Sequence, residues 1–244
     1  MSSFHAAEYY ELLGNRGGRL DREGPFLLEA LASAPSNRVL DLASGLGLHA
    51  HYLAERGAEV SAYDLSEGMT EHARKQRPHP KIRYAAGDMR YPQGGPYGLA
   101  LCVGNSLCLL DGRDSLDLFF QGVAGVLHPG GILITQTLNY DKPALKKPRI
   151  RVEQEQNDRQ HLVAVKSFQP ADTQTRLTID YFEAVSGSVR KTSEESLLQH
   201  WTAELLTECA AKAGMKMESG RGSYDGAPLT PDSTDIILLY RKTD

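Results

Sequence analysis

Short apolar runs alternate with segments of helical periodicity along residues 38–137 of this 244-residue chain. A short apolar run predicts a strand, and apolar residues that recur with the helical period predict a helix. The expected strands are 39–43, 59–64, 81–86, 98–103 and 132–137, and the expected helices between them are 47–56, 67–76 and 113–127. Strands joined through helices form right-handed crossovers and a parallel sheet. The order therefore predicts an α/β fold.

The pattern changes after residue 140, where polar and apolar residues alternate with the period of two. Such segments predict antiparallel strands with one face in water, and they lie at 149–155, 161–168, 174–185 and 189–198. A helix at 203–213 and strands at 215–219 and 234–241 follow. We expect one domain over 1–244, divided into an N-terminal helical cap (1–37), a ligand-binding core (38–140), an inserted sheet (141–200) and the last helix and strands of the core (201–244).

The composition argues against several classes of protein. The 27 Lys and Arg residues and the 31 Asp and Glu residues give a formal charge of −4, which disfavours bulk electrostatic binding to nucleic acid or to an anionic membrane. No apolar run is long enough to span a membrane, and no secretory signal is visible. The three cysteines lack CxxC spacing, which indicates reduced and buried thiols, and we expect no metal site. These features predict a cytoplasmic protein.

The first strand ends in a glycine turn that contains Gly45 and Gly47, and a helix begins there. Such a turn needs glycine once for backbone freedom and once so that a ligand can approach closely. The helix N-terminus leaves unpaired N–H groups that can hold an anionic or polar ligand. The spacing Gly45-x-Gly47-x-x-Ala50 also fits a dinucleotide-binding pattern, so the turn alone leaves a dinucleotide as one alternative.

Two aspartates narrow the choice of ligand. Asp41 lies inside the apolar strand, where a carboxylate is costly to bury without a partner. A cationic ligand would supply that partner, whereas a pyrophosphate would not. Asp64 ends the next strand, 64 − 45 = 19 residues after the first glycine, where a carboxylate accepts hydrogen bonds from ribose hydroxyls. S-adenosylmethionine, an adenosine with a cationic amino-acid end, satisfies both aspartates.

Residues 39–139 resemble the class I S-adenosylmethionine-dependent methyltransferases, and the resemblance resumes over 201–243. The segments that carry it are 39–47, 60–69, 86–89, 101–106 and 127–131. The resemblance implies a Rossmann-like sheet of seven mostly parallel strands with the last strand antiparallel, an antiparallel insertion after the fifth strand, and N-terminal helices. It also implies that the cofactor is held by Arg19, Asp41, Ala43, Gly45, Gly47, Asp64, Leu65, Met69, Gly87, Asp88, Met89, Val103 and Asn105.

Within that family, residues 104–106 and 139–141 are most similar to glycine and sarcosine N-methyltransferases. Those enzymes methylate small amines and amino acids and also carry antiparallel strands after strand five. In their segment that covers the cofactor an arginine holds the cofactor carboxylate, and Arg19 aligns best with it. The resemblance makes Asn105, Asn139 and Tyr140 the catalytic candidates, and we expect them to line the acceptor site together with one of the N-terminal tyrosines.

Departures from the subfamily leave the acceptor open. Residues 107–109 replace its usual aromatic and histidine, and Gln136 stands where it often has a histidine. The prediction is methyl transfer to a small molecule by a monomer or homo-oligomer, with N-methylation of an amino acid or small amine favoured over O- or C-methylation of a larger metabolite. A non-catalytic S-adenosylmethionine-binding protein and an NAD-dependent oxidoreductase are the alternatives, and Asp41 argues against the latter. His49 and His51 are expected to be surface or cap residues.

Overall fold

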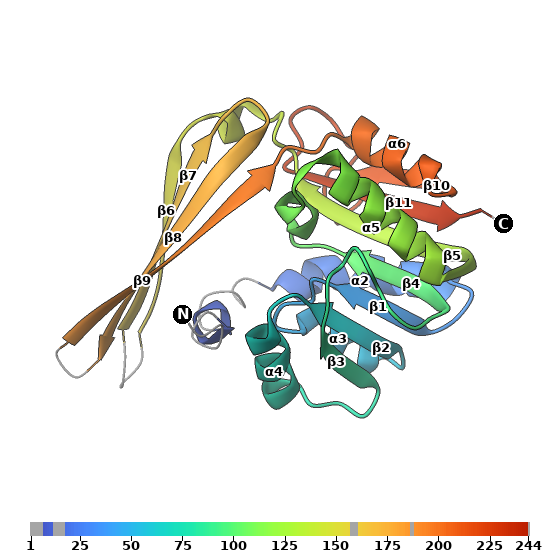
Figure 1. Ribbon diagram of the computed structural model, residues 1–244, viewed down its shortest axis with the longest axis horizontal. Helices are drawn as coiled ribbons and strands as arrows, with labels where there is room; N and C mark the ends of the chain where they lie inside the picture. The colour runs from blue at the N-terminus through green and yellow to red at the C-terminus, as the bar shows by residue number, and fades with distance from the viewer. Residues whose placement is uncertain (1–6, 12–17, 157–160, 186–187, 244) are drawn as a thin grey trace.

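A computed structural model describes residues 7–11, 18–156, 161–185 and 188–243. Among these residues seven strands form one sheet, in the order β10-β11-β5-β4-β1-β2-β3 (Figure 1). Their bounds are β1 (Arg38–Leu42), β2 (Glu59–Asp64), β3 (Ile82–Ala86), β4 (Tyr97–Cys102), β5 (Leu127–Leu138), β10 (Met215–Arg221) and β11 (Asp235–Lys242). β11 runs antiparallel to both of its neighbours, and the pairs among β1 to β5 are parallel. The predicted sheet, with its antiparallel last strand, is confirmed.

Helices cover both faces of this sheet (Figure 1). One apolar cluster joins the sheet to α2 (Arg19–Ser33), α3 (Leu48–Ala54) and α4 (Glu67–Gln76), and the other joins it to α5 (Gly112–Val126) and α6 (Ala203–Lys212). Successive side chains of a strand point to opposite faces. Val39 of β1 accordingly lies in the first cluster and Leu40 in the second.

The insertion between β5 and α6 is a second, four-stranded antiparallel sheet that stands away from the core (Figure 1). Its strands are β6 (Arg149–Gln156), β7 (His161–Pro170), β8 (Gln174–Val185) and β9 (Ser188–Gln199), in that order across the sheet. Each matches a predicted strand to within two residues at either end, because one polar face and one apolar face leave a clear period of two. A short turn of 3₁₀ helix, η2 (Pro143–Lys146), connects this sheet to β5.

Residues 7–11 are helical and bridge the inserted sheet to the core. Tyr9 stacks on Tyr181 of β8 with 4.7 Å between ring centroids. On the core side, Arg77, which follows α4, donates to both oxygens of Glu11 at 2.8 and 2.5 Å. This short helix therefore spans the gap between two parts of the chain that are far apart in sequence.

Two predicted boundaries were wrong. The N-terminal cap was expected to be helical as far as residue 37, but α2 ends at Ser33, because the residue before a proline avoids the helical region and Ala34 precedes Pro35 in an extended conformation. Residues 1–6 and 12–17 of that cap lie outside the described residues. β5 begins at Leu127 rather than 132, since the Pro-Gly-Gly turn is accommodated as an irregularity within the strand.

Phe119→Ala tests the cluster under α5. Phe119 is fully buried and packs edge-on against Phe120, so truncation removes apolar contacts and leaves a cavity. We expect the free energy of unfolding to fall by about 3–5 kcal/mol, measured by urea denaturation. The control is Leu118→Ala on the same helix, where the side chain is 38% exposed, with an expected loss below about 1 kcal/mol. Equal losses in the two variants would contradict this packing.

Candidate active site

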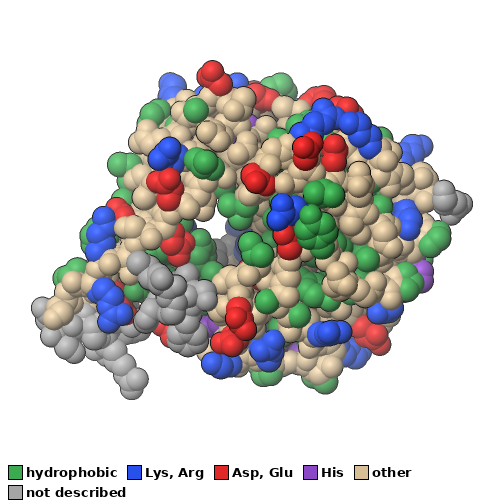
Figure 2. All heavy atoms as spheres, viewed as in Figure 1, with side chains coloured by type: hydrophobic (Ala, Val, Ile, Leu, Met, Phe, Trp, Pro, Cys, Tyr) green, Lys and Arg blue, Asp and Glu red, His purple; other side chains and the backbone are tan. Residues whose placement is uncertain are grey.

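A cleft of about 510 Å³ lies where β1, β2 and β4 end at the carboxyl edge of the sheet. Figure 2 shows the molecule hollowed between the inserted sheet at the left and the core at the right. The beginning of α2, the 7–11 helix and β9 supply the remaining walls. Nine of the predicted cofactor residues line this cleft: Arg19, Asp41, Ala43, Gly45, Asp64, Leu65, Met69, Met89 and Val103.

The glycine turn between β1 and α3 forms the floor of the cleft. Gly45 has a φ of +52°, and a Cβ added to it would meet no atom within 4 Å, so this position opens onto free space. Gly47 has a φ of +71°, but an added Cβ would lie 2.7 Å from the ring of Tyr84. The first glycine therefore leaves room for a ligand. The second, which does not line the cleft, is required for packing.

Asp64 ties this turn to the start of α4. One carboxylate oxygen accepts from the backbone N–H of Gly45 at 2.8 Å and the other from that of Ser66 at 2.9 Å. Burial raises the pKa of Asp64 even though both hydrogen bonds favour the ionised form. The carboxylate is thus held in one orientation, and an ionised oxygen can accept further hydrogen bonds from hydroxyls in the cleft.

Asp41 is almost completely buried at the end of β1, and its Oδ2 atom has no hydrogen-bond partner. Burial raises the pKa of its carboxyl to about 6. The N–H of Ala50 and the nearby side chain of His49 favour the ionised form but do not outweigh burial. An unpartnered oxygen in a ligand cleft is the feature that a cationic amino group would satisfy.

A buried network lies beside Asp41. Glu23 of α2 accepts from the Nε atom of Arg19 at 2.7 Å and lies 2.6 Å from the Nε2 atom of His49. Burial would raise the pKa of Glu23, but the hydrogen bond from His49 and the charge of Arg19 outweigh it and lower the pKa. The prediction that His49 is a surface or cap residue was wrong, because Glu23, 26 positions away in sequence, lies against it.

The side chain of Gln136 stabilises the turn after β4 through hydrogen bonds. Its Oε1 atom accepts from the backbone N–H groups of Gly104 and Asn105 at 2.7 and 3.0 Å. The Asn105 side chain donates to the hydroxyl of Tyr140 at 2.9 Å and accepts from the N–H of Leu138. Asn105 and Tyr140 are thus brought together, as expected, but neither side chain lines the cleft.

Three other predicted residues also lie off the cleft wall. Asn139 donates its side-chain amide to the carbonyl oxygens of residues 230, 231 and 233, so it anchors the segment before β11. Asp88 forms an ion pair with Arg90 at 2.6 Å. Gly87 is needed because an added Cβ would lie 2.9 Å from the ring of Tyr63. These contacts stabilise the loops behind the cleft, and the predicted roles of these three residues stay predictions.

The cleft also contains side chains that sequence reasoning did not assign to it. Ser44, Leu46, Leu48 and Ser66 flank predicted positions and could have been included for that reason. Tyr10 fits the expectation that one N-terminal tyrosine reaches the site. Glu194 comes from the middle of a polar strand of the insertion, where nothing in the local pattern distinguishes it from its neighbours.

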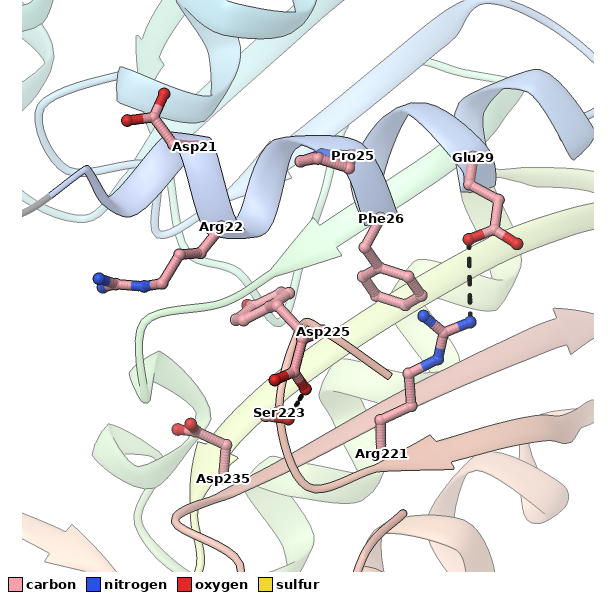
Figure 3. Close-up of a pocket in the computed structure, with 10 residues that line it drawn as sticks. Asp21, Arg22, Pro25, Phe26, Glu29, Arg221, Ser223, Asp225 and Asp235 are labelled. Carbon is pink, nitrogen blue, oxygen red and sulfur yellow. Dashed lines mark hydrogen bonds and ion pairs between the residues drawn. The ribbon is translucent and has the colours of Figure 1, made fainter. Parts of the chain in front are cut away.

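A second cavity, of about 560 Å³, lies between α2 and the segment that joins β10 to β11 (Figure 3). Arg221 spans its wall, with its guanidinium 4.5 Å from the ring centre of Phe26 and 3.8 Å from the carboxylate of Glu29. Asp235 also lines it and accepts from the side chain of Gln136 at 2.7 Å. The second cavity is therefore linked to the turn after β4 by hydrogen bonds and shares no described lining residue with the cleft.

Comparison with known proteins agrees with this geometry. Residues 39–131 match the family described as "Methyltransferase domain". The glycine/sarcosine N-methyltransferase of Halorhodospira halochloris is 34% identical over 134 residues, which cover 50% of this chain and 48% of that protein. The dTDP-3-amino-3,4,6-trideoxy-alpha-D-glucopyranose N,N-dimethyltransferase of Streptomyces venezuelae is 23% identical over 79% of this chain and 84% of its own length.

The whole chain superimposes on a solved structure, an S-adenosylmethionine-dependent methyltransferase from Clostridium acetobutylicum, with a TM-score of 0.81. The two are 19% identical, and the match covers 98% of each chain. Residues 39–131 thus carry a methyltransferase domain, and the chain has the fold of S-adenosylmethionine-dependent methyltransferases. The chain spans about half the length of the glycine-type relatives that it matches. None of the helices in its described part is both long and apolar enough to cross a membrane.

Asp64→Ala tests the sugar-binding assignment. The substitution removes the carboxylate that is oriented towards the cleft, and hydrogen bonds to a charged group are worth about 1.5–3 kcal/mol. We expect the affinity of the protein for S-adenosylhomocysteine to fall by about tenfold or more in isothermal titration, with the far-UV spectrum unchanged. Glu67→Ala, three residues away on an exposed position of α4, is the control and should bind normally. Unchanged affinity in Asp64→Ala would remove the ribose assignment.

The raised pKa of the Asp41 carboxyl predicts how cofactor binding depends on pH. In the free protein its carboxyl has a pKa of about 6, and pairing with a cationic amino group lowers that value. The affinity for S-adenosylhomocysteine should therefore reach its full value above pH 7, where Asp41 is ionised. It should decline by up to about tenfold as the pH falls to 5. Asp41→Asn should bind weakly and lose most of this pH dependence. Parallel pH profiles for the variant and the wild type would contradict the assignment.

Proposed function

We propose that this methyltransferase transfers a methyl group from S-adenosylmethionine to the nitrogen of a small-molecule amine. The observation that carries the proposal is the unpartnered oxygen of Asp41 in the same cleft as the oriented carboxylate of Asp64. Those two groups suit the amino group and the ribose of one ligand. The relatives that act on glycine, sarcosine and an amino sugar are all N-methyltransferases by name, which favours nitrogen over oxygen or carbon.

In this proposal, different residues of the cleft bind different parts of the cofactor. Arg19, fixed by Glu23, binds the carboxylate of the methionine end, and Asp41 binds its amino group. Asp64 accepts from the ribose hydroxyls, and the apolar side chains of Leu65 and Met89 pack against the adenine. Leu65 is 78% exposed, and covering it with a ligand ring would remove that apolar surface from water.

When bound, the cofactor would supply a methyl group already activated by a positive sulfur. The lone pair of the acceptor nitrogen would form the new nitrogen–carbon bond as the carbon–sulfur bond breaks; the electron pair of the broken bond would stay on sulfur, and the proton lost from nitrogen would pass to water. The protein contributes alignment and the exclusion of water. The backbone turn at Gly104 and Asn105, fixed by Gln136, limits where an acceptor nitrogen can lie. The 7–11 helix and β9 close the opposite side of the cleft through Tyr10 and Glu194.

A turnover assay tests the proposal. The methyltransferase is incubated with S-adenosylmethionine and a panel of small amines, and S-adenosylhomocysteine is quantified by chromatography. We expect release that depends on the amine and that falls by about tenfold or more in Asp64→Ala. Binding of S-adenosylhomocysteine without turnover of any amine, alcohol or activated carbon acid would instead support a non-catalytic binding protein.

A further inference from the structure

We propose that Glu194 binds the ammonium group of the methyl acceptor and passes to water the proton that this nitrogen loses before it attacks, and that the acceptor is an amine without a neighbouring carboxylate rather than an α-amino acid. This inference rests on the proposed methyl transfer and narrows its substrate class. The inference depends on two observations: the charges of the side chains that line the cleft, and the orientation of the Glu194 side chain on the inserted sheet.

The register of the inserted sheet turns Glu194 towards the cleft. Glu194 of β9 lies directly opposite Ile179 of β8, and cross-strand partners share a face of a sheet. That face also carries Tyr181 and is covered by Tyr9 of the N-terminal helix. The next residue, Glu195, points to the other face, where it lies 3.3 Å from Arg176 in an exposed ion pair.

Among the described residues, the Glu194 carboxylate has a tyrosine hydroxyl beside it and no cationic partner. The hydroxyl of Tyr181 lies 3.5 Å from a carboxylate oxygen of Glu194, and Tyr181 is in turn hydrogen-bonded to Tyr10. In the described part of the chain no Lys, Arg or His lies within 4.0 Å of Glu194 in an ion pair. A half-buried carboxylate flanked by aromatic rings is a binding site for an organic ammonium, through charge and through the ring faces.

The balance of charges in the cleft disfavours a second carboxylate. The acidic side chains that line it are Asp41, Asp64 and Glu194, whereas the basic ones among the described residues are Arg19 and His49. Both basic side chains are already bound to Glu23, and the proposed cofactor carboxylate also uses Arg19. The carboxylate of a glycine-like acceptor would lie near Glu194 without a cation, which is costly in a desolvated site.

A matched pair of acceptors separates the two substrate classes. Ethanolamine and glycine are of similar size and differ in carrying a hydroxyl or a carboxylate beside the amine, and 3-amino-3-deoxyglucose adds a larger carboxylate-free amine. We expect kcat/KM, measured from S-adenosylhomocysteine release, to be at least about tenfold higher for ethanolamine or the amino sugar than for glycine or sarcosine. Equal or higher values for glycine or sarcosine, or turnover of none of the four, would overturn the inference.

Glu194→Gln tests the residue itself, with Glu195→Gln as the matched control on the opposite face. For the best carboxylate-free amine, Glu194→Gln should lower kcat/KM by about tenfold or more, because a charge-assisted hydrogen bond becomes neutral. Glu195→Gln should leave kcat/KM unchanged, and an unchanged kcat/KM in Glu194→Gln would overturn the assignment. Titration with S-adenosylhomocysteine distinguishes the two proposals. If the wild type does not bind it, the proposed function is wrong. If the wild type binds it normally but prefers glycine as the acceptor, only this inference is wrong.

Discussion

The hydrogen bonds from Gly45 and Ser66 to the Asp64 carboxylate join the two loops on which the cleft depends. One loop follows β1 and the other follows β2, and these strands are parallel neighbours, so their carboxyl ends meet at one edge. A single, partly buried carboxylate thus shapes the glycine turn and the start of α4 together. The Asp64 carboxylate is also oriented towards the space where a ligand would lie. The group that stabilises the two loops is therefore also the group proposed to bind the ligand.

Charge compensation organises the rest of the cleft. Glu23 satisfies Arg19 and His49, and Gln136 satisfies two backbone N–H groups of the turn after β4. Against this background of paired groups, the unpartnered oxygen of Asp41 and the carboxylate of Glu194 stand out. We interpret the first as the partner of the cofactor's amino group and the second as the partner of the acceptor nitrogen, which would bind as an ammonium and lose a proton before it attacks.

Much of the fold could be predicted because its elements carry local signals. The strand Glu59–Asp64 and the helix Glu67–Gln76 lie at the predicted residues, because apolar residues alternate along the strand and Ser66 caps the start of the helix. The start of β5 at Leu127 could not be predicted, because glycine and proline signal a turn whether or not the chain stays hydrogen-bonded to the neighbouring strand. For the site, Asp41, Gly45 and Asp64 were predicted from the sequence and line the cleft, whereas Asn139 has the expected sequence context but lies off the cleft wall, with its amide bound to the segment before β11.

The sequence by itself determined the order of strands and helices, the glycine turn and the two aspartates that flank it, because periodicity and spacing are properties of neighbouring residues. Only the tertiary structure decided which distant side chains meet there: Glu23 with His49, Gln136 with the 104–105 turn, and Glu194 with the cleft. Periodicity reports which face of an element is buried but not what lies against that face. The partners are selected by how the helices and the inserted sheet pack, and for that reason the proposed acceptor site could be located only from the tertiary structure.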